Sequence, residues 1–147
     1  MSRACSALTA TVIIGALMAG CAREATPTDG LPRSWGETLS LDGDRLQVQI
    51  LCYKAVTLAQ QRYSGLGEKT GVIGKGLEGV RSTLEDRVVS DFSRGDEKMR
   101  LNAGAEARIQ KLLREQPYGS SEVLLNTAYA CADLERRDAW RDMTPHR

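Results

Sequence analysis

The feature that most constrains this chain is its N-terminal segment, which ends in a cysteine. Arg3 is the only charged residue before Cys21, and the most apolar part of the uncharged run spans residues 8–18. A basic start, a short apolar core and small residues before a cleavage site are typical of a secretory signal. The apolar core is shorter than the roughly 20 residues that a membrane-spanning helix needs. We therefore expect the chain to be exported and residues 1–20 to be removed.

The end of this segment, Met18-Ala19-Gly20-Cys21, resembles the lipobox of bacterial lipoproteins, although Met18 stands where leucine is usual. The resemblance implies that the Cys21 sulfur receives a diacylglycerol and that its new amine is acylated, palmitate being a typical chain. Two or more acyl chains anchor a protein stably, so the membrane is expected to be a partner through Cys21. Ala22 stands where aspartate would imply retention in the inner membrane. The resemblance thus implies the periplasmic face of the outer membrane of a Gram-negative bacterium. The alternatives are an uncleaved signal anchor and ordinary cleavage with a free Cys21 thiol.

The number and positions of the cysteines lead to a second prediction. Of four cysteines, Cys5 is lost with the signal and Cys21 is taken by lipid, which leaves Cys52 and Cys131 in an oxidising compartment. We expect a disulfide between them, which by closing a loop of about 80 residues stabilises the fold by about 4–5 kcal/mol. Two separately buried thiols are the alternative. Two cysteines without histidines are too few for a zinc site, so no metal or other cofactor is expected.

Composition limits the partners and the core. The chain has 20 basic and 19 acidic residues, so its net charge gives no reason to expect nucleic acid as a partner. With one phenylalanine and two tryptophans, the core must be built mainly from leucine, valine, isoleucine and alanine.

The segments on either side of the expected domain are polar. Residues 21–41 contain Pro27, Gly30, Pro32 and Gly36 and are interpreted as a flexible tether. Within that tether, Trp35 and Leu39 either dock on the domain or lie at the lipid interface. Residues 138–147 are interpreted as a fraying, charged C-terminal tail, which leaves 42–137 as the domain.

Apolar residues within 42–137 recur at the three- and four-residue spacing of amphipathic helices. Four helices are predicted: one from Asp42 or Asp44 to about 65, one over 73–92, one over 97–115, and one capped by Ser120 or Ser121. Short connections favour an all-α fold, a small antiparallel bundle of about four helices, stapled by one disulfide. Cys52 and Cys131 lie on the inward faces of the first and last helices.

A glycine-rich segment, residues 65–76, separates the first two helices. A phosphate-binding loop needs Gly, four residues, Gly-Lys and then Ser or Thr. The segment has Lys69 and Gly76 at two of those positions and fails twice. We interpret it as a mobile interhelical loop, or alternatively as a loop that binds a protein partner. Its candidate residues are Gly65, Gly67, Lys69, Gly71, Gly74, Lys75 and Gly76.

Residues for catalysis are sparse. The single histidine, His146, is next to the end of the chain and is expected to be disordered. A Ser-His-Asp or Cys-His arrangement is therefore not expected, nor is an enzyme or a small-molecule substrate. A recognition surface could be formed by four tyrosines with Arg62, because tyrosine and arginine are enriched in binding hot spots; partly buried helix-edge positions are the alternative for each. These tyrosines are Tyr53, Tyr63, Tyr118 and Tyr129.

The expected function is a lipid-anchored, periplasm-facing helical protein-binding module, an adaptor or accessory lipoprotein of the envelope. The body is also similar in outline to small helical periplasmic immunity proteins of the Tai and Rap1a kind, through Cys52-Tyr53-Lys54-Ala55 in an early helix and Tyr129-Ala130-Cys131 in a late one. That resemblance implies neutralisation of a secreted toxin by occlusion of its active cleft. A structural envelope lipoprotein without a dedicated partner is the third possibility.

Overall fold

The computed structural model describes residues 31–63, 71–91 and 95–146, and these residues form an all-α fold. The helices are α1 (Arg45–Tyr63), α2 (Gly71–Asp91), α3 (Gly95–Glu115) and α4 (Ser120–Arg136), followed by the short 3₁₀ helix η2 (Ala139–Asp142). The prediction of an all-α fold of four helices is confirmed. Within the described ranges, no helix combines the length and apolarity that crossing a membrane requires.

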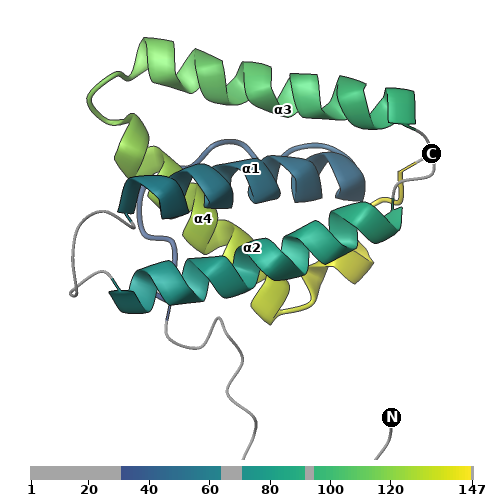
Figure 1. The fold of residues 1–147 in the computed structure, drawn as a ribbon, viewed down its shortest axis with the longest axis horizontal. Coiled ribbons are helices and arrows are strands. Elements are labelled where there is room, and N and C mark those ends of the chain that lie inside the picture. Colours follow the sequence, from purple (N-terminus) through teal and green to yellow (C-terminus); the bar gives the residue numbers. More distant parts are fainter. Residues whose placement is uncertain (1–30, 64–70, 92–94, 147) are drawn as a thin grey trace, which may run out of the picture.

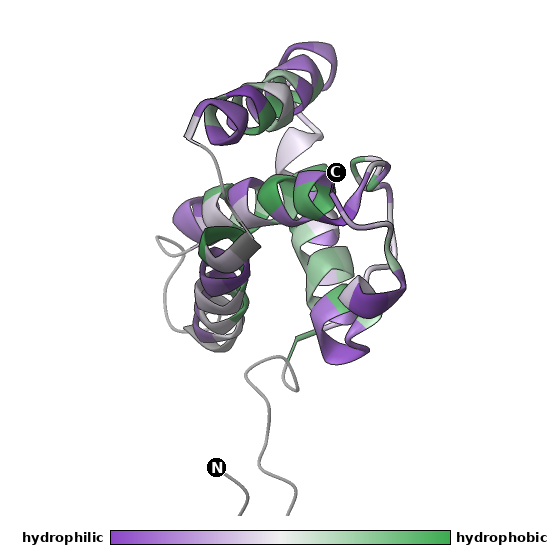
Figure 2. Cartoon of the chain, turned by 90° about the vertical axis from the view of Figure 1, so that its right-hand side faces the viewer, coloured by the Kyte–Doolittle hydropathy of each residue, from purple (hydrophilic) through white to green (hydrophobic). Residues whose placement is uncertain are grey.

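Helix α1 occupies the centre of the fold. α3 lies on one side of α1, and α2 lies on the other (Figures 1 and 2). α2 runs antiparallel to α1, α3 turns back to the direction of α1, and α4 crosses obliquely behind α1 (Figure 1). α1 contacts each of the other three helices. The arrangement therefore places one helix inside the others, rather than four equivalent helices around a common axis.

Because it has neighbours on several sides, α1 is buried around most of its circumference. A helix on the surface of a domain normally buries one apolar stripe, and the sequence pattern predicted such a stripe here. The structure instead buries consecutive residues: Leu46, Val48, Gln49, Ile50, Leu51 and Cys52, and further along Ala55, Val56 and Ala59. One of these, Gln49, is polar and becomes important below.

The start of α1 is fixed by its own side chains. Asp44 Oδ1 accepts a hydrogen bond from the Gln47 backbone N–H at 3.0 Å, and Gln47 Oε1 accepts one from the Asp44 N–H at 3.0 Å. This reciprocal pair is a capping box, which satisfies two backbone donors at a helix N-terminus. Of the two predicted caps, Asp44 is therefore the one used.

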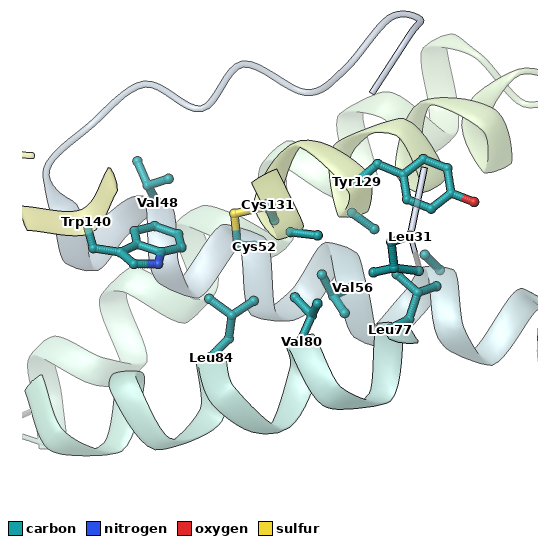
Figure 3. Packing of buried hydrophobic residues seen from close by; sticks show 13 residues of the cluster. Leu31, Val48, Cys52, Val56, Leu77, Val80, Leu84, Tyr129, Cys131 and Trp140 are labelled. Atoms are coloured by element: carbon teal, nitrogen blue, oxygen red, sulfur yellow. A yellow bond between two sulfur atoms is a disulfide. The ribbon is translucent and has the colours of Figure 1, made fainter. Parts of the chain in front are cut away.

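The disulfide joins the central helix to the last one. Cys52 in α1 and Cys131 in α4 are bonded, at a sequence separation of 79, and neither is exposed. The bond lies in a core to which α1, α2, α4, Leu31 and Trp140 contribute (Figure 3). A second cluster fills the space between α1, α3 and the first half of α4. The predicted pairing of Cys52 with Cys131 is confirmed.

The prediction of a flexible tether over 21–41 is wrong for residues 31–41, the part that the structure describes. Leu31 is buried beside Leu77 and Tyr129 (Figure 3). Farther along, the Leu39 N–H donates a hydrogen bond of 2.9 Å to Thr127 Oγ1. The segment docks on α4 because its few apolar side chains and backbone donors find partners there. Leu39 thus docks on the domain, one of the two predicted alternatives.

The prediction that residues 138–147 fray is wrong for 138–146. Trp140 is only 1% exposed and closes the end of the disulfide core (Figure 3). The Arg45 N–H donates a 2.9 Å hydrogen bond to the Thr144 carbonyl. His146, which we expected to be disordered, is hydrogen-bonded to side chains of two helices, as described below. Together these contacts hold the charged segment against the domain.

The glycine-rich segment also departs from its prediction. Residues 71–76 form the first turns of α2 instead of a loop. At Gly76 a Cβ atom would lie 2.6 Å from Leu31 Cδ2, so the absence of a side chain lets residue 31 pack against the helix. This glycine therefore serves helix packing rather than loop mobility.

The start of α4 is the last correction. Neither Ser120 nor Ser121 is the N-cap, because Gly119 takes that position without a side-chain hydrogen bond. Both serine hydroxyls instead accept hydrogen bonds from Arg62 Nη1, at 3.4 Å and 2.6 Å respectively. The serines thus tie the end of α1 to the start of α4.

Candidate functional site

The N-terminal segment and the turn between α3 and α4 meet at one end of the fold, where α3 ends in Figure 1. Pro117 lacks the N–H that a continuing helix needs, so the chain turns at this point. Gln116 Nε2 donates a hydrogen bond of 3.1 Å to Glu37 Oε1, which joins the turn to the segment. Two stretches 79 residues apart in sequence are therefore held side by side.

A small cavity opens at this junction. Its volume is about 190 Å³, and we call it the acidic cleft. Its lining residues are Glu37, Gln116, Gly119, Glu122, Val123 and Asn126. Glu37 and Glu122 are the charged members of this lining, and both are acidic. The cleft therefore carries a negative potential that favours a basic group.

Two large side chains that project into solvent belong to residues close in sequence to those that line the acidic cleft. Trp35 is 72% exposed, and Tyr118 is fully exposed. Trp35 directly precedes Gly36, which packs on Asn126, and Tyr118 directly precedes Gly119 in the lining. Exposed tryptophan and tyrosine are the residue types most enriched in binding hot spots. Their places beside an acidic cavity mark this end of the fold as a candidate interface.

Asn126 is a buried member of the lining of the cleft. It is 1% exposed, and among the described residues its Nδ2 donor has no hydrogen-bond partner. A Cβ atom at Gly36 would lie 2.4 Å from Nδ2, so only glycine allows the backbone to pass this close. A buried donor without a partner costs about 1–3 kcal/mol. A carbonyl oxygen brought by a bound segment would supply the missing acceptor.

The described residues of the predicted loop do not line this cleft. Gly71, Gly74, Lys75 and Gly76 lie in α2, and the other three, Gly65, Gly67 and Lys69, lie outside the described residues. Cys21, the predicted lipidation site, also lies outside them. The site predicted from sequence and the site indicated by the structure are therefore different.

The predicted recognition tyrosines separate into two groups. Tyr129 is buried in the disulfide core, and Tyr53 and Tyr63 are half-buried on α1. Burial raises the pKa of Tyr129, and the nearby Tyr63 raises it further. Tyr118 alone projects fully into solvent. The alternative of partly buried helix-edge positions is confirmed for Tyr53 and Tyr63.

Sequence reasoning missed Glu37, Glu122 and Asn126 as site residues. Nothing local marks them, because a glutamate in the first turn of a helix is ordinary and asparagine is common in helices. Their significance arises from docking of residues 31–41 on α4. A signal existed only for Trp35, a large aromatic residue in a polar stretch.

No group of three or more metal-ligating side chains occurs in the part of the chain that the structure describes. Comparison of the chain with protein-family models, with curated proteins and with solved structures found no match.

Proposed function

We propose that this protein is a lipid-anchored, periplasm-facing module of the bacterial envelope that binds another protein at the acidic cleft. The signal-like N-terminus and Cys21 support the anchoring, and the confirmed disulfide is consistent with an oxidising compartment. The observation that carries the binding proposal is the buried Asn126 Nδ2, which has no hydrogen-bond partner among the described residues, in a cavity that Glu37 and Glu122 also line.

The chemistry of the cleft defines the kind of partner. Glu37 and Glu122 favour a lysine or arginine side chain, which Trp35 and Tyr118 can cover through cation–π contact. A backbone carbonyl next to that basic residue would accept from Asn126 Nδ2. The partner is thus a protein that presents a basic, exposed segment. Binding rather than catalysis is proposed because the lining of the cleft includes no hydroxyl, thiol or imidazole group.

Anchoring is tested separately from binding. The full chain expressed in a Gram-negative host should incorporate labelled palmitate and fractionate with the outer membrane. Cys21→Ser should release it into the periplasm. Ala22→Asp should leave the lipid in place but move the protein to the inner membrane. Palmitate-free wild-type protein in the soluble periplasm would contradict the anchoring proposal.

Binding is tested with a photo-crosslinking amino acid at position 118 of the full chain in living cells. The expected result is an adduct with one protein, mapped to a lysine- or arginine-containing segment, that weakens at high salt. The double variant E37Q/E122Q should reduce the adduct at least tenfold. The matched control places the crosslinker at Val89, which is also exposed but lies on α2.

The outcomes also separate the three functional possibilities. An envelope protein in the adduct supports an adaptor, and a secreted toxin supports an immunity protein. No adduct at position 118, with anchoring intact, would overturn the binding proposal and favour a structural lipoprotein. An adduct that survives E37Q/E122Q would overturn the assignment of the acidic cleft.

A further inference from the structure

A second, larger cavity lies at the other end of the fold, where α1 begins, α2 ends and η2 packs (Figure 1). Its volume is about 320 Å³. Its lining residues are Arg45, Gln49, Arg87, Ser90, Glu135, Asp138, Trp140 and Arg141. Almost all of them carry hydrogen-bonding groups, which distinguishes this polar cavity from the apolar core beside it.

The wall of the polar cavity is held by a network around Glu135. Arg87 donates from Nε and Nη2 to Glu135, with the shortest contact at 2.7 Å. The indole N–H of Trp140 donates to the other oxygen at 2.6 Å. Asp138 lies 3.8 Å from Arg87 and also pairs with Arg141. Both carboxylates of the cavity are therefore already neutralised by protein groups.

Gln49 also lines the cavity, but the oxygen of its side chain is not satisfied by this network. It is 1% exposed, lines the cavity one helical turn after Arg45, and its Oε1 has no hydrogen-bond partner among the described residues. Its neighbours on α1, Val48 and Ile50, are buried apolar residues. Leucine at position 49 would fill a similar volume without leaving an acceptor unpaired. An amide here costs stability, and that cost is offset if a ligand donates to it.

The charged residues of the cavity indicate which second group the ligand carries, besides a donor for Gln49. Three guanidinium groups, those of Arg45, Arg87 and Arg141, line the cavity. Planar guanidinium groups bind carboxylates well because their N–H groups match the two oxygens. We propose that the polar cavity binds a small molecule bearing a carboxylate and, close to it, an N–H or O–H donor. The carboxylate faces the arginines and the donor faces Gln49 Oε1.

This chemistry is that of a free amino acid, a hydroxy acid or the carboxyl end of a peptide. The volume is near the lower end of the range for small-molecule sites, as such a ligand requires. The inference is independent of the proposed protein-binding function, because the two cavities lie at opposite ends of the fold (Figure 1).

The test uses the full-length protein purified from membranes in detergent, in a Trp35→Phe background. Trp140, which lines the cavity, is then the only tryptophan and reports on it. Glycine, glycolate and N-acetylglycine are titrated as probes for the three ligand sources. Acetate lacks the donor and ethanolamine lacks the carboxylate. At least one of the first three should change Trp140 fluorescence and raise the Tm by several degrees at saturation, and neither control should.

Gln49→Leu separates recognition from folding. The variant should fold with a Tm equal to or above that of the parent, because the unpaired acceptor is removed, and should lose the ligand response at least tenfold. Gln60→Leu, the same change at a half-buried position of α1 outside the cavity, should keep the response. No response to any of the three probes in the parent protein would overturn the proposal. A response that Gln49→Leu retains, or one given equally by acetate, would also overturn it.

Discussion

The imidazole Nδ1 of His146 lies 2.7 Å from Oδ2 of Asp44, the residue that caps α1. The other ring nitrogen lies 2.6 Å from Glu97 in the first turn of α3. One side chain near the C-terminus therefore connects the starts of two helices that are far apart in sequence. A ring that contacts two carboxylates through both nitrogens is best satisfied when it is protonated, since both nitrogens then donate.

The first prediction concerns the pH dependence of this contact. The pKa of His146 is raised by the hydrogen bonds to Asp44 and Glu97, with partial burial opposing them. Burial acts to raise the pKa of Asp44, but its hydrogen bonds with the Gln47 backbone and His146 outweigh burial and lower it. Because the folded state binds the histidine proton more tightly, the stabilisation is complete below about pH 6.5 and is lost as the pH rises through the raised pKa. Because the pKa of Asp44 is lowered, its carboxylate stays ionised over this pH range.

Urea unfolding of the wild type and of His146→Gln, followed by circular dichroism, measures this contribution. The wild type should be the more stable at pH 5.5, and most of its advantage should be gone at pH 9. Lys75→Gln removes an exposed positive charge on α2 and controls for the change in net charge. An equal difference between wild type and His146→Gln at both pH values would contradict the prediction.

The second prediction concerns Trp140. Removing a buried aromatic side chain leaves a cavity, so Trp140→Ala should destabilise the fold by about 3–5 kcal/mol. Trp140→Phe keeps most of the packing but loses the hydrogen bond to Glu135, and should cost about 1–2 kcal/mol. Urea unfolding measures both. If residues 138–147 frayed, both changes would stay within about 0.5 kcal/mol.

Much of the fold could be predicted because the apolar periodicity of the sequence matches the helices that form the core. Helix periodicity indicated four helices, and the two cysteines expected to remain after removal of the signal could pair only with each other. The errors at the two ends of the domain have one physical cause, the docking of terminal segments through apolar residues. Leu31 and Trp140 each lie in a polar stretch, so composition indicated a tether and a tail. Burial of one leucine or tryptophan against a preformed core outweighed that composition.

The candidate sites were less predictable than the fold. The acidic cleft and the polar cavity depend on Asn126 and Gln49, two buried amides on helices. In the sequence each is an ordinary polar residue within a helix. Only the packing of residues 31–41 over α4, and of η2 beside α1, makes them buried and unpaired. Long-range contacts of this kind have no signature in local sequence.

The third prediction concerns the disulfide. Because Cys52 and Cys131 are fully buried, dithiothreitol should reduce the bond slowly in native buffer and quickly in urea, as scored by the mass added on thiol alkylation. The double variant C52A/C131A should lose about 4 kcal/mol, because a loop of 79 residues is no longer closed in the unfolded chain. Rapid reduction of the native protein would contradict the burial of this bond.

The fourth prediction compares two glycines of α2. At Gly74 an added Cβ would meet nothing within 4 Å, whereas at Gly76 it would meet Leu31 Cγ at 2.8 Å. Alanine is favoured over glycine in a helix by up to about 1 kcal/mol, so Gly74→Ala should stabilise the protein by roughly that amount. Gly76→Ala gains the same propensity but must displace Leu31, and overpacking typically costs about 1–3 kcal/mol. Thermal unfolding should therefore place the two variants on opposite sides of the wild type. Equal stabilisation by both would show that Leu31 is not seated on Gly76, and the docking of residues 31–41 would then have to be abandoned.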